Sequence, residues 1–229
     1  MKTRSVLILI FSFILMGLSQ SDMPLEKSIK TKESPDSYKV ANIDTQNAEQ
    51  LASFGKKLLN EGRYEESLEP LKNAIKLDPK DADTHFHLGL AYGAMGKQEE
   101  KITHYKEATR LNPEHAHALF KLGLAEAALN RHQQAIGYYK NALYSDPYLP
   151  KANYFLGLSY YLSGRFKEAL TPLKKALDSE PDNPQVYYSL GLAYLKLGEY
   201  KKSLPPLKNA LSRKPNLHQE MANINLAQN

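Results

Sequence analysis

The chain has 229 residues and no cysteine, which excludes disulfides and every zinc or redox centre built on cysteine. It carries 30 basic and 25 acidic residues, a formal net charge of +5. A nucleic-acid-binding protein would show a dominant basic stripe with stacking aromatic residues on the same face. Acidic residues such as Glu65 and Glu66 interleave with the lysines here, so we expect no nucleic acid as a partner.

Residues 1–19 have the pattern of a secretory signal peptide. A positively charged start precedes an apolar run over residues 6–18, and the small Gly17 and Ser19 suit cleavage before Gln20. The run is shorter than the roughly 20 residues that cross a bilayer. We therefore predict a protein exported to a bacterial periplasm or cell envelope, with no integral membrane span after cleavage. An uncleaved N-terminal membrane tether is the alternative.

Residues 20–47 are polar, with several lysines and glutamates and few large apolar side chains. Such a composition buries too little apolar surface to offset the entropy of ordering the chain, so we predict a disordered linker. In the alternative reading, Tyr38, Val40 and Ile43 lie back on the following residues as an extended cover.

After residue 47, whole columns of residues recur at a spacing of 34 residues. The prolines that do so are Pro79, Pro113, Pro147, Pro181 and Pro215. Two columns of glycine follow the same period: Gly55, Gly89, Gly123, Gly157 and Gly191, then Gly62, Gly96, Asn130, Gly164 and Gly198. Self-similarity at one fixed period predicts a solenoid whose repeats contact only their neighbours.

The repeat is similar to the tetratricopeptide repeat, a pair of antiparallel helices. The fourth unit carries the pattern in full, with Leu156, Gly157, Tyr160, Gly164, Phe166, Ala169, Leu173, Ala176 and Pro181. The resemblance implies an all-α, right-handed α-solenoid of five helix-turn-helix repeats over residues 48–215. By the period, the units are 48–81, 82–115, 116–149, 150–183 and 184–217, and a C-terminal capping helix follows at residues 216–229.

The glycine and proline columns predict local geometry. The glycine after each leucine lets a neighbouring helix approach closely, and the second glycine column suits a turn with positive φ. Pro150 and Pro184 are expected to open first helices, where a missing N–H is harmless. Three sites fall about one turn inside second helices and predict local kinks on the outer face: Pro70, Pro172 and the pair Pro205–Pro206.

Departures from the repeat pattern concentrate at the joint between the second and third units. Gln98 and His132 replace aromatic residues, Lys101 replaces a small residue, and Glu126 replaces a tyrosine. We predict an ion pair between Lys101 and Glu126 and a softened joint at this place.

The candidate partner-binding residues follow from the resemblance, which implies that the first helices line a concave groove. Their predicted groove stripe is apolar and aromatic: Phe86, Leu90, Phe120, Leu124, Tyr154, Leu158, Tyr161, Tyr188, Leu192 and Leu195. Such a groove suits an extended segment or an amphipathic helix with hydrophobic anchors. The alternative is that these residues pack between adjacent repeats. Relatives that clamp a terminal carboxylate use Lys, Asn and Arg on these helices, and that clamp is absent here.

No catalytic, cofactor or metal motif stands out. The sequence has no phosphate-binding glycine loop, no HExxH and no G-x-S-x-G, and its seven histidines show no metal-ligand spacing. We therefore expect no enzyme activity, cofactor or metal. The sequence predicts a non-enzymatic protein–protein interaction scaffold of the cell envelope. The alternatives are a self-associating structural protein and an accessory subunit of an envelope enzyme or a secretion or assembly complex.

Overall fold

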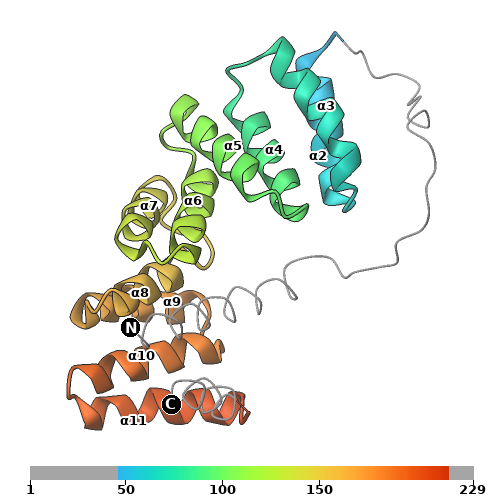
Figure 1. Cartoon of the computed structure of the whole chain (residues 1–229). Coiled ribbons are helices and arrows are strands. Elements are labelled where there is room, and N and C mark those ends of the chain that lie inside the picture. Colours follow the sequence, from blue (N-terminus) through green and yellow to red (C-terminus); the bar gives the residue numbers. More distant parts are fainter. Residues whose placement is uncertain (1–45, 217–229) are drawn as a thin grey trace. The chain divides into compact units, whose positions relative to one another are not determined.

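The computed structural model describes residues 46–216. The predicted signal peptide, nearly all of the predicted linker and the predicted capping helix after Asn216 lie outside this range and stay predictions. Within it the secondary structure is entirely helical (Figure 1). The ten helices are α2 (Ala48–Asn60), α3 (Tyr64–Leu77), α4 (Ala82–Ala94), α5 (Gln98–Leu111), α6 (Ala116–Ala128), α7 (His132–Ser145), α8 (Ala152–Leu162), α9 (Phe166–Ser179), α10 (Pro184–Lys196) and α11 (Tyr200–Arg213).

The helices form five consecutive pairs, and each pair is one 34-residue repeat. The turn inside each pair holds one residue with positive φ, as predicted: Gly62 (76°), Gly96 (76°), Asn130 (58°), Gly164 (80°) and Gly198 (74°). Four of the first helices are capped by a side chain at their N-terminus, as where the Asn47 side chain accepts a hydrogen bond from the Gln50 amide. The repeat boundaries therefore follow local turn and cap chemistry.

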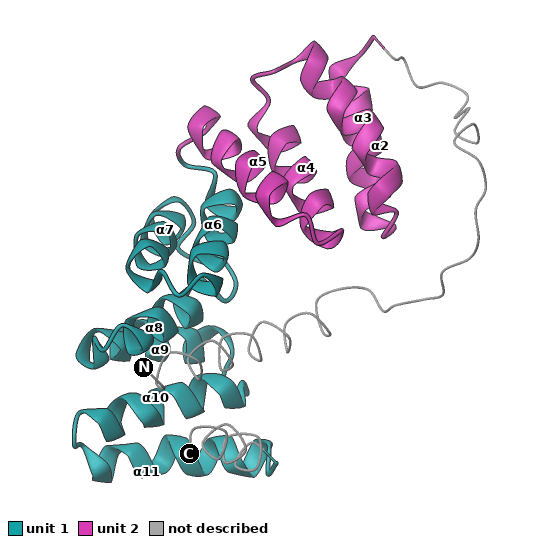
Figure 2. Cartoon of the chain, in the orientation of Figure 1, with its two compact units in different colours: residues 1–15, 114–229 teal, residues 16–113 magenta. Residues whose placement is uncertain are grey.

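The chain forms two compact units (Figure 2). One contains α2–α5 and ends at Pro113, and the other contains α6–α11 and begins at Glu114. The boundary falls at the joint where the repeat pattern is weakest.

Within each unit the first helices are the more closely spaced layer. Each first helix packs against the second helix of its own repeat and against the preceding second helix of its unit. First helices also contact one another directly, α2 with α4, α6 with α8, and α8 with α10, whereas second helices of successive repeats make at most marginal contact. A stack that is tighter on one side curves toward that side, which puts the first helices on the inner face of each unit.

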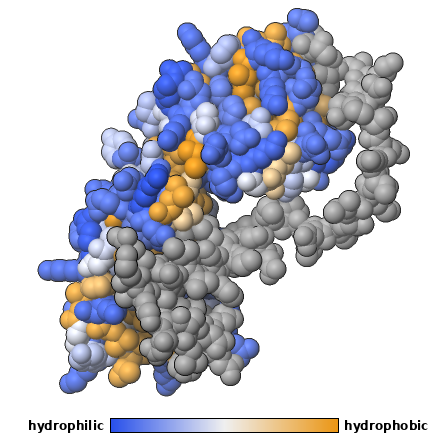
Figure 3. Space-filling model, viewed as in Figure 1, coloured by the Kyte–Doolittle hydropathy of each residue, from blue (hydrophilic) through white to orange (hydrophobic). Residues whose placement is uncertain are grey.

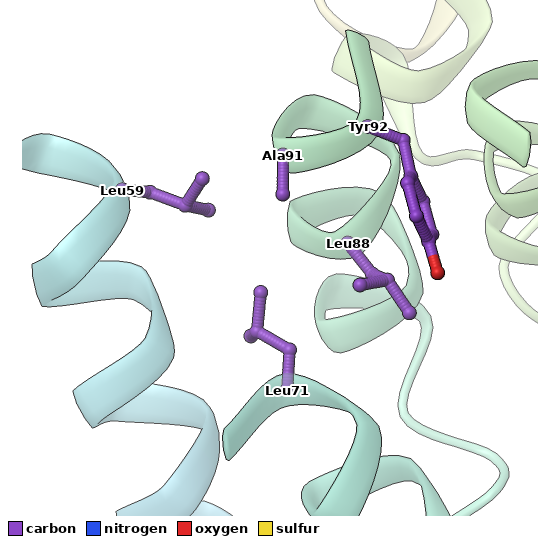
Figure 4. Close-up of a cluster of buried hydrophobic side chains, with 5 residues drawn as sticks. All are labelled: Leu59, Leu71, Leu88, Ala91 and Tyr92. Carbon is purple, nitrogen blue, oxygen red and sulfur yellow. The ribbon is translucent and has the colours of Figure 1, made fainter. Parts of the chain in front are cut away.

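The core of the first unit shows how one repeat covers the next (Figure 4). Leu59 of α2 and Leu71 of α3 form one cluster with Leu88, Ala91 and Tyr92 of α4. Leu71 is fully buried. Because three of the five residues of this cluster come from the following repeat, the first helix pair depends on its neighbour for burial.

The two prolines expected to open first helices behave differently. Pro184 is the first residue of α10, behind an Asn183 cap, as predicted. Pro150 does not open α8, which begins at Ala152 after Lys151 in a left-handed conformation (φ 62°). The reason lies one residue earlier, where Leu149 is 4% exposed in a cluster that includes Leu119, Ala142 and Ala152. Burying Leu149 holds the chain in a turn and delays the helix.

Prolines inside second helices do not interrupt them. Helices α3, α9 and α11 run through Pro70, Pro172 and the Pro205–Pro206 pair. The prediction that these residues lie on the outer face is wrong for Pro70, Pro172 and Pro206, which are buried. These three prolines stand at the same position of the 34-residue repeat. Their apolar rings are packed in the interior, although each proline removes one backbone hydrogen bond from its helix.

Candidate partner-binding face

The ten predicted groove residues divide between the two units. Phe86 and Leu90 lie on α4 in the unit of α2–α5. The other eight lie on three successive first helices of the second unit, α6, α8 and α10. We call these eight the first-helix face: Phe120, Leu124, Tyr154, Leu158, Tyr161, Tyr188, Leu192 and Leu195.

On α6 the face is aromatic and half-buried. The Phe120 ring lies 5.7 Å from the ring of Tyr139 in α7 and 5.7 Å from that of Phe155 in α8. These distances are typical of aromatic pairs, so Phe120 joins two repeats as well as facing outward. Leu124, one helical turn further along, is half-buried too.

On α8 two members of the face belong to the core. Tyr154 is 5% exposed and Leu158 is 3% exposed. The Tyr154 ring lies 5.2 Å from that of Phe155, and burial raises the pKa of its phenol. For these two residues the alternative to an open groove, packing between adjacent repeats, is therefore the one that applies. They form the floor of the first-helix face.

The exposed part of the face lies toward the C-terminal end. Tyr161 of α8 is half-buried against Phe166, with ring centroids 5.4 Å apart. Burial raises its pKa, and the nearby Tyr188 phenol of α10 raises it further. Two tyrosines from neighbouring first helices therefore lie close enough to interact. Leu192 is half-buried, and Leu195 is exposed.

The two residues in the other unit are mostly packing residues. Phe86 is 8% exposed and lies against the rings of Tyr105 and His87, at 5.8 and 5.6 Å. Leu90 is half-buried beside the core cluster of Figure 4. Neither offers a large exposed surface.

A histidine pair in the unit of α2–α5 was not found from the sequence. His85 Nδ1 lies 3.2 Å from His104 Nδ1, and the His104 ring stacks on Tyr92 at 5.5 Å. The 34-residue period did contain a signal for this pair. By that period, His104 stands at the second-helix position that Pro70 occupies in the first repeat. Over residues 46–216, no three His, Asp or Glu side chains gather in a way that could hold a metal ion.

The predicted ion pair between Lys101 and Glu126 joins residues of different units and stays a prediction. Inside its own unit, Glu126 accepts from Arg131 at 3.4 Å, and Lys101 donates to the Gln98 side chain. Each residue thus has a local partner.

Matches to known families decide the classification of these repeats. A family described as TPR repeat matches residues 55–96 and 157–198. Two families described as tetratricopeptide repeat match residues 102–150 and residues 82–115 and 184–217. The chain belongs to the tetratricopeptide repeat (TPR) family.

Solved TPR structures share this fold over most of the chain. A crystal structure of MamA is 26% identical with a TM-score of 0.64, covering 75% of this chain and 94% of that one. A second MamA structure is 27% identical with a TM-score of 0.63, covering 72% and 96%. YrrB, described as a TPR protein with an unusual peptide-binding site, has a TM-score of 0.69 at 21% identity, covering 78% and 94%.

A curated relative matches a shorter part of the chain. The protein O-mannosyl-transferase Tmtc2 of Drosophila melanogaster is 34% identical over 86 residues. That match covers 38% of this TPR chain and only 9% of the transferase.

The TPR array provides a protein-interaction scaffold, because stacked repeats present an extended inner surface. In that surface, six of the eight residues of the first-helix face retain exposure. Within residues 46–216, no helix combines the length and apolar character needed to cross a membrane.

Proposed function

We propose that this TPR protein is a non-enzymatic scaffold of the bacterial cell envelope that binds a peptide or protein segment on its first-helix face. The observation that carries the proposal is the row of partly exposed apolar and aromatic side chains on α6, α8 and α10: Phe120, Leu124, Tyr161, Tyr188, Leu192 and Leu195. Contiguous apolar surface of this kind commonly marks a partner site.

The chemistry of the face indicates the class of partner. Tyr161 and Tyr188 combine a large apolar ring with a hydroxyl, which is the type of side chain that dominates binding energy at interfaces. Phe120 and Leu124 stand where carboxylate-clamping relatives carry polar or charged residues. An extended segment or amphipathic helix with hydrophobic anchors fits this face better than a free carboxylate does.

Two further observations support parts of the proposal. YrrB, which shares the fold, is described as having an unusual peptide-binding site, so the architecture can present one. The envelope location rests on the N-terminal sequence pattern alone. The competing proposals are a homo-oligomer that buries the same face and an accessory subunit of an envelope complex.

The test is a peptide-display selection on the chain beginning at Gln20, followed by Kd measurements. We expect selected peptides to carry spaced apolar anchors and to bind Tyr188→Ala at least tenfold more weakly. The matched control is Tyr144→Ala on α7, because Tyr144 is 83% exposed and lies on a second helix. Equal Kd values for both variants would refute the groove assignment. Light scattering of the unliganded chain measures its oligomeric state and so distinguishes partner binding from self-association. A stable oligomer that Tyr188→Ala disrupts would favour self-association.

A further inference from the structure

The second helices of the two units differ in charge. Helices α3 and α5 carry five basic and six acidic residues, whereas α7, α9 and α11 carry eight basic and two acidic residues. Figure 3 shows hydrophilic residues on the visible surface of both units, so the sign of the charge is what differs, and not the hydropathy. A charge asymmetry between two parts of a chain is a sign of an anionic partner for the basic part.

The difference arises at fixed positions of the 34-residue repeat. One exposed position of the second helix changes from acidic to basic along the array: Glu65, Glu99, Gln133, Lys167 and Lys201. A second exposed position, two helical turns further along the same side, is lysine in every repeat: Lys72, Lys106, Lys140, Lys174 and Lys208. In the first unit these lysines therefore share their side of the helix with glutamate, and in the second unit they share it with glutamine or lysine.

The exposed lysines of the second unit lie on its outer side. The first helices form the inner face of the unit, so the exposed residues of the second helices point away from that face. We call five of these residues on α7, α9 and α11 the lysine face: Lys140, Lys167, Lys174, Lys201 and Lys208.

Acidic residues neutralise little of the lysine face. Within residues 46–216, three of its members make no ion pair: Lys167, Lys201 and Lys208. Of the two acidic residues on these helices, Glu168 pairs with Arg165. The hydrogen bond from Arg165, and then the charge of Lys140, lower the pKa of Glu168. The face therefore keeps an excess of positive charge.

Packing explains one member of the lysine face. The Lys174 ammonium lies 5.9 Å from the centroid of the Tyr194 ring, and in the first unit Lys72 lies at the same distance from the ring of Tyr92. A cation over an aromatic ring is stabilising wherever it occurs in the array. This contact gives no reason for the change from glutamate to Lys167 and Lys201.

The composition of the lysine face favours a membrane over a nucleic acid. Lysine is a flexible point charge, whereas arginine binds phosphate groups in a fixed, bidentate geometry. Seven of the eight basic residues in α7, α9 and α11 are lysines, and the one arginine, Arg213, pairs with Asp182 at 3.2 Å. One turn beyond the lysine column stand Tyr144, Asp178 and Ser212, which do not form a row of rings for stacking bases.

We propose that the lysine face binds a bilayer that contains anionic lipids. The Tyr144 side chain is 83% exposed one turn from Lys140, and its apolar ring with a polar tip suits the boundary between lipid and water. The export pattern at the N-terminus predicts access to such a bilayer. The lysine face lies on the outer side of the unit and the first-helix face on the inner side, so each proposal can fail without the other.

The first test measures binding to lipid vesicles. The chain beginning at Gln20, which lacks the apolar N-terminal run, is mixed with vesicles of phosphatidylcholine, with or without phosphatidylglycerol. The bound fraction is measured by sedimentation. We expect binding only to vesicles that contain phosphatidylglycerol, and we expect it to weaken as salt is added. Binding to neither kind of vesicle, or equal binding to both, would overturn the proposal.

Two double variants that lose the same charge locate the binding surface. Lys174→Gln/Lys208→Gln should lower the vesicle partition coefficient roughly tenfold or more, because each lysine near an anionic membrane contributes on the order of fivefold. The matched control is Lys72→Gln/Lys106→Gln, because these lysines hold the same repeat position among the glutamates of the first unit. We expect the control to change the coefficient by less than about threefold. Equal losses would show that only net charge matters and would overturn the proposal.

A single tryptophan reports which side of the unit meets the lipid, because the chain has no tryptophan of its own. Tyr144→Trp places the reporter beside the lysine face, and Tyr188→Trp places it on the first-helix face. We expect anionic vesicles to shift the fluorescence of the first variant to shorter wavelength and to leave the second unchanged. A shift in the second variant alone would overturn the proposal. Displacement of the chain from vesicles by duplex DNA at equal phosphate concentration would assign the lysine face to nucleic acid instead.

Discussion

A Cβ atom built on Gly157 of α8 would lie 2.6 Å from Cγ of Leu173 in α9, closer than real Cβ atoms approach other heavy atoms. The two helices of the fourth repeat therefore pack at a distance that only glycine allows. The same relationship recurs in every repeat at the same register: Gly55 with Leu71, Gly89 with Tyr105, Gly123 with Tyr139 and Gly191 with Leu207. This contact is the physical cause of the first glycine column.

Replacing Gly157 should therefore destabilise the second unit. The new methyl group of Gly157→Ala would also meet Leu173 Cδ2 at 2.9 Å and the Leu173 backbone nitrogen at 3.2 Å, and the backbone cannot easily yield. The overpacking should lower the free energy of unfolding by about 1–3 kcal/mol. This loss should exceed the roughly 1 kcal/mol by which alanine stabilises a helix relative to glycine. The matched control is Gly137→Ala in α7, where a Cβ meets nothing within 4 Å. Urea unfolding should show a lower midpoint for the first variant and a higher one for the second.

The turn residues should respond to backbone conformation alone. A Cβ on Gly164 has open space around it, but its φ is +80°. Gly164→Ala should cost about 1–2 kcal/mol, the penalty for a left-handed L-residue. Asn130 has the corresponding φ of 58°, so Asn130→Gly should be neutral or stabilise slightly. Thermal unfolding of both variants measures this, and a stabilised Gly164→Ala would contradict the assigned turn geometry.

The Tyr139 hydroxyl should contribute nothing favourable to folding. Its ring is fully buried against Gly123 and Phe155, and the hydroxyl oxygen is buried without a hydrogen-bond partner. Because an unsatisfied buried hydroxyl costs free energy, Tyr139→Phe should be neutral or stabilise by about 1 kcal/mol. Tyr139→Leu is the companion variant, expected to destabilise through lost packing. A Tyr139→Phe protein less stable than the wild type by over about 1 kcal/mol would reveal a partner for the hydroxyl.

Acid should destabilise the unit of α2–α5 through its histidine pair. Burial, and then the neighbouring His85 and Lys72, lower the pKa of His104 below its ordinary value of 6.5. Between the lowered pKa and 6.5 the unfolded chain binds a proton that the folded chain does not. The stabilising contribution is therefore complete above pH 6.5 and is lost as the pH falls toward the folded-state pKa.

The variant that tests this dependence is His104→Phe, which keeps a ring against Tyr92 and removes the titrating group. Its urea midpoint should fall less than that of the wild type between pH 7.5 and pH 5. Some dependence should remain, because burial also lowers the pKa of His87. His117→Phe, which alters an exposed histidine, is the control. An unchanged pH dependence in His104→Phe would show that the pair does not couple to folding.

Much of the fold was predictable because its causes are local. The second helices begin at Tyr64, Gln98, His132, Phe166 and Tyr200, in step with the 34-residue period. Glycine or asparagine in each turn, and a proline after each second helix, act through their own φ angles and missing N–H groups. The register of the glycine column also implied a close helix contact, and the structure confirms it.

The candidate face was less predictable, because helical register fixes which residues share a side but not what covers them. Tyr154 and Tyr188 hold the same position in successive repeats, yet Tyr154 is buried and Tyr188 is half-exposed. The burial of Leu149 likewise moved the start of α8 to Ala152. The sequence by itself determined the number of repeats, their helix pairs and their turns. Only the tertiary structure decided which apolar residues are core and which remain open to a partner, because burial depends on how neighbouring helices pack.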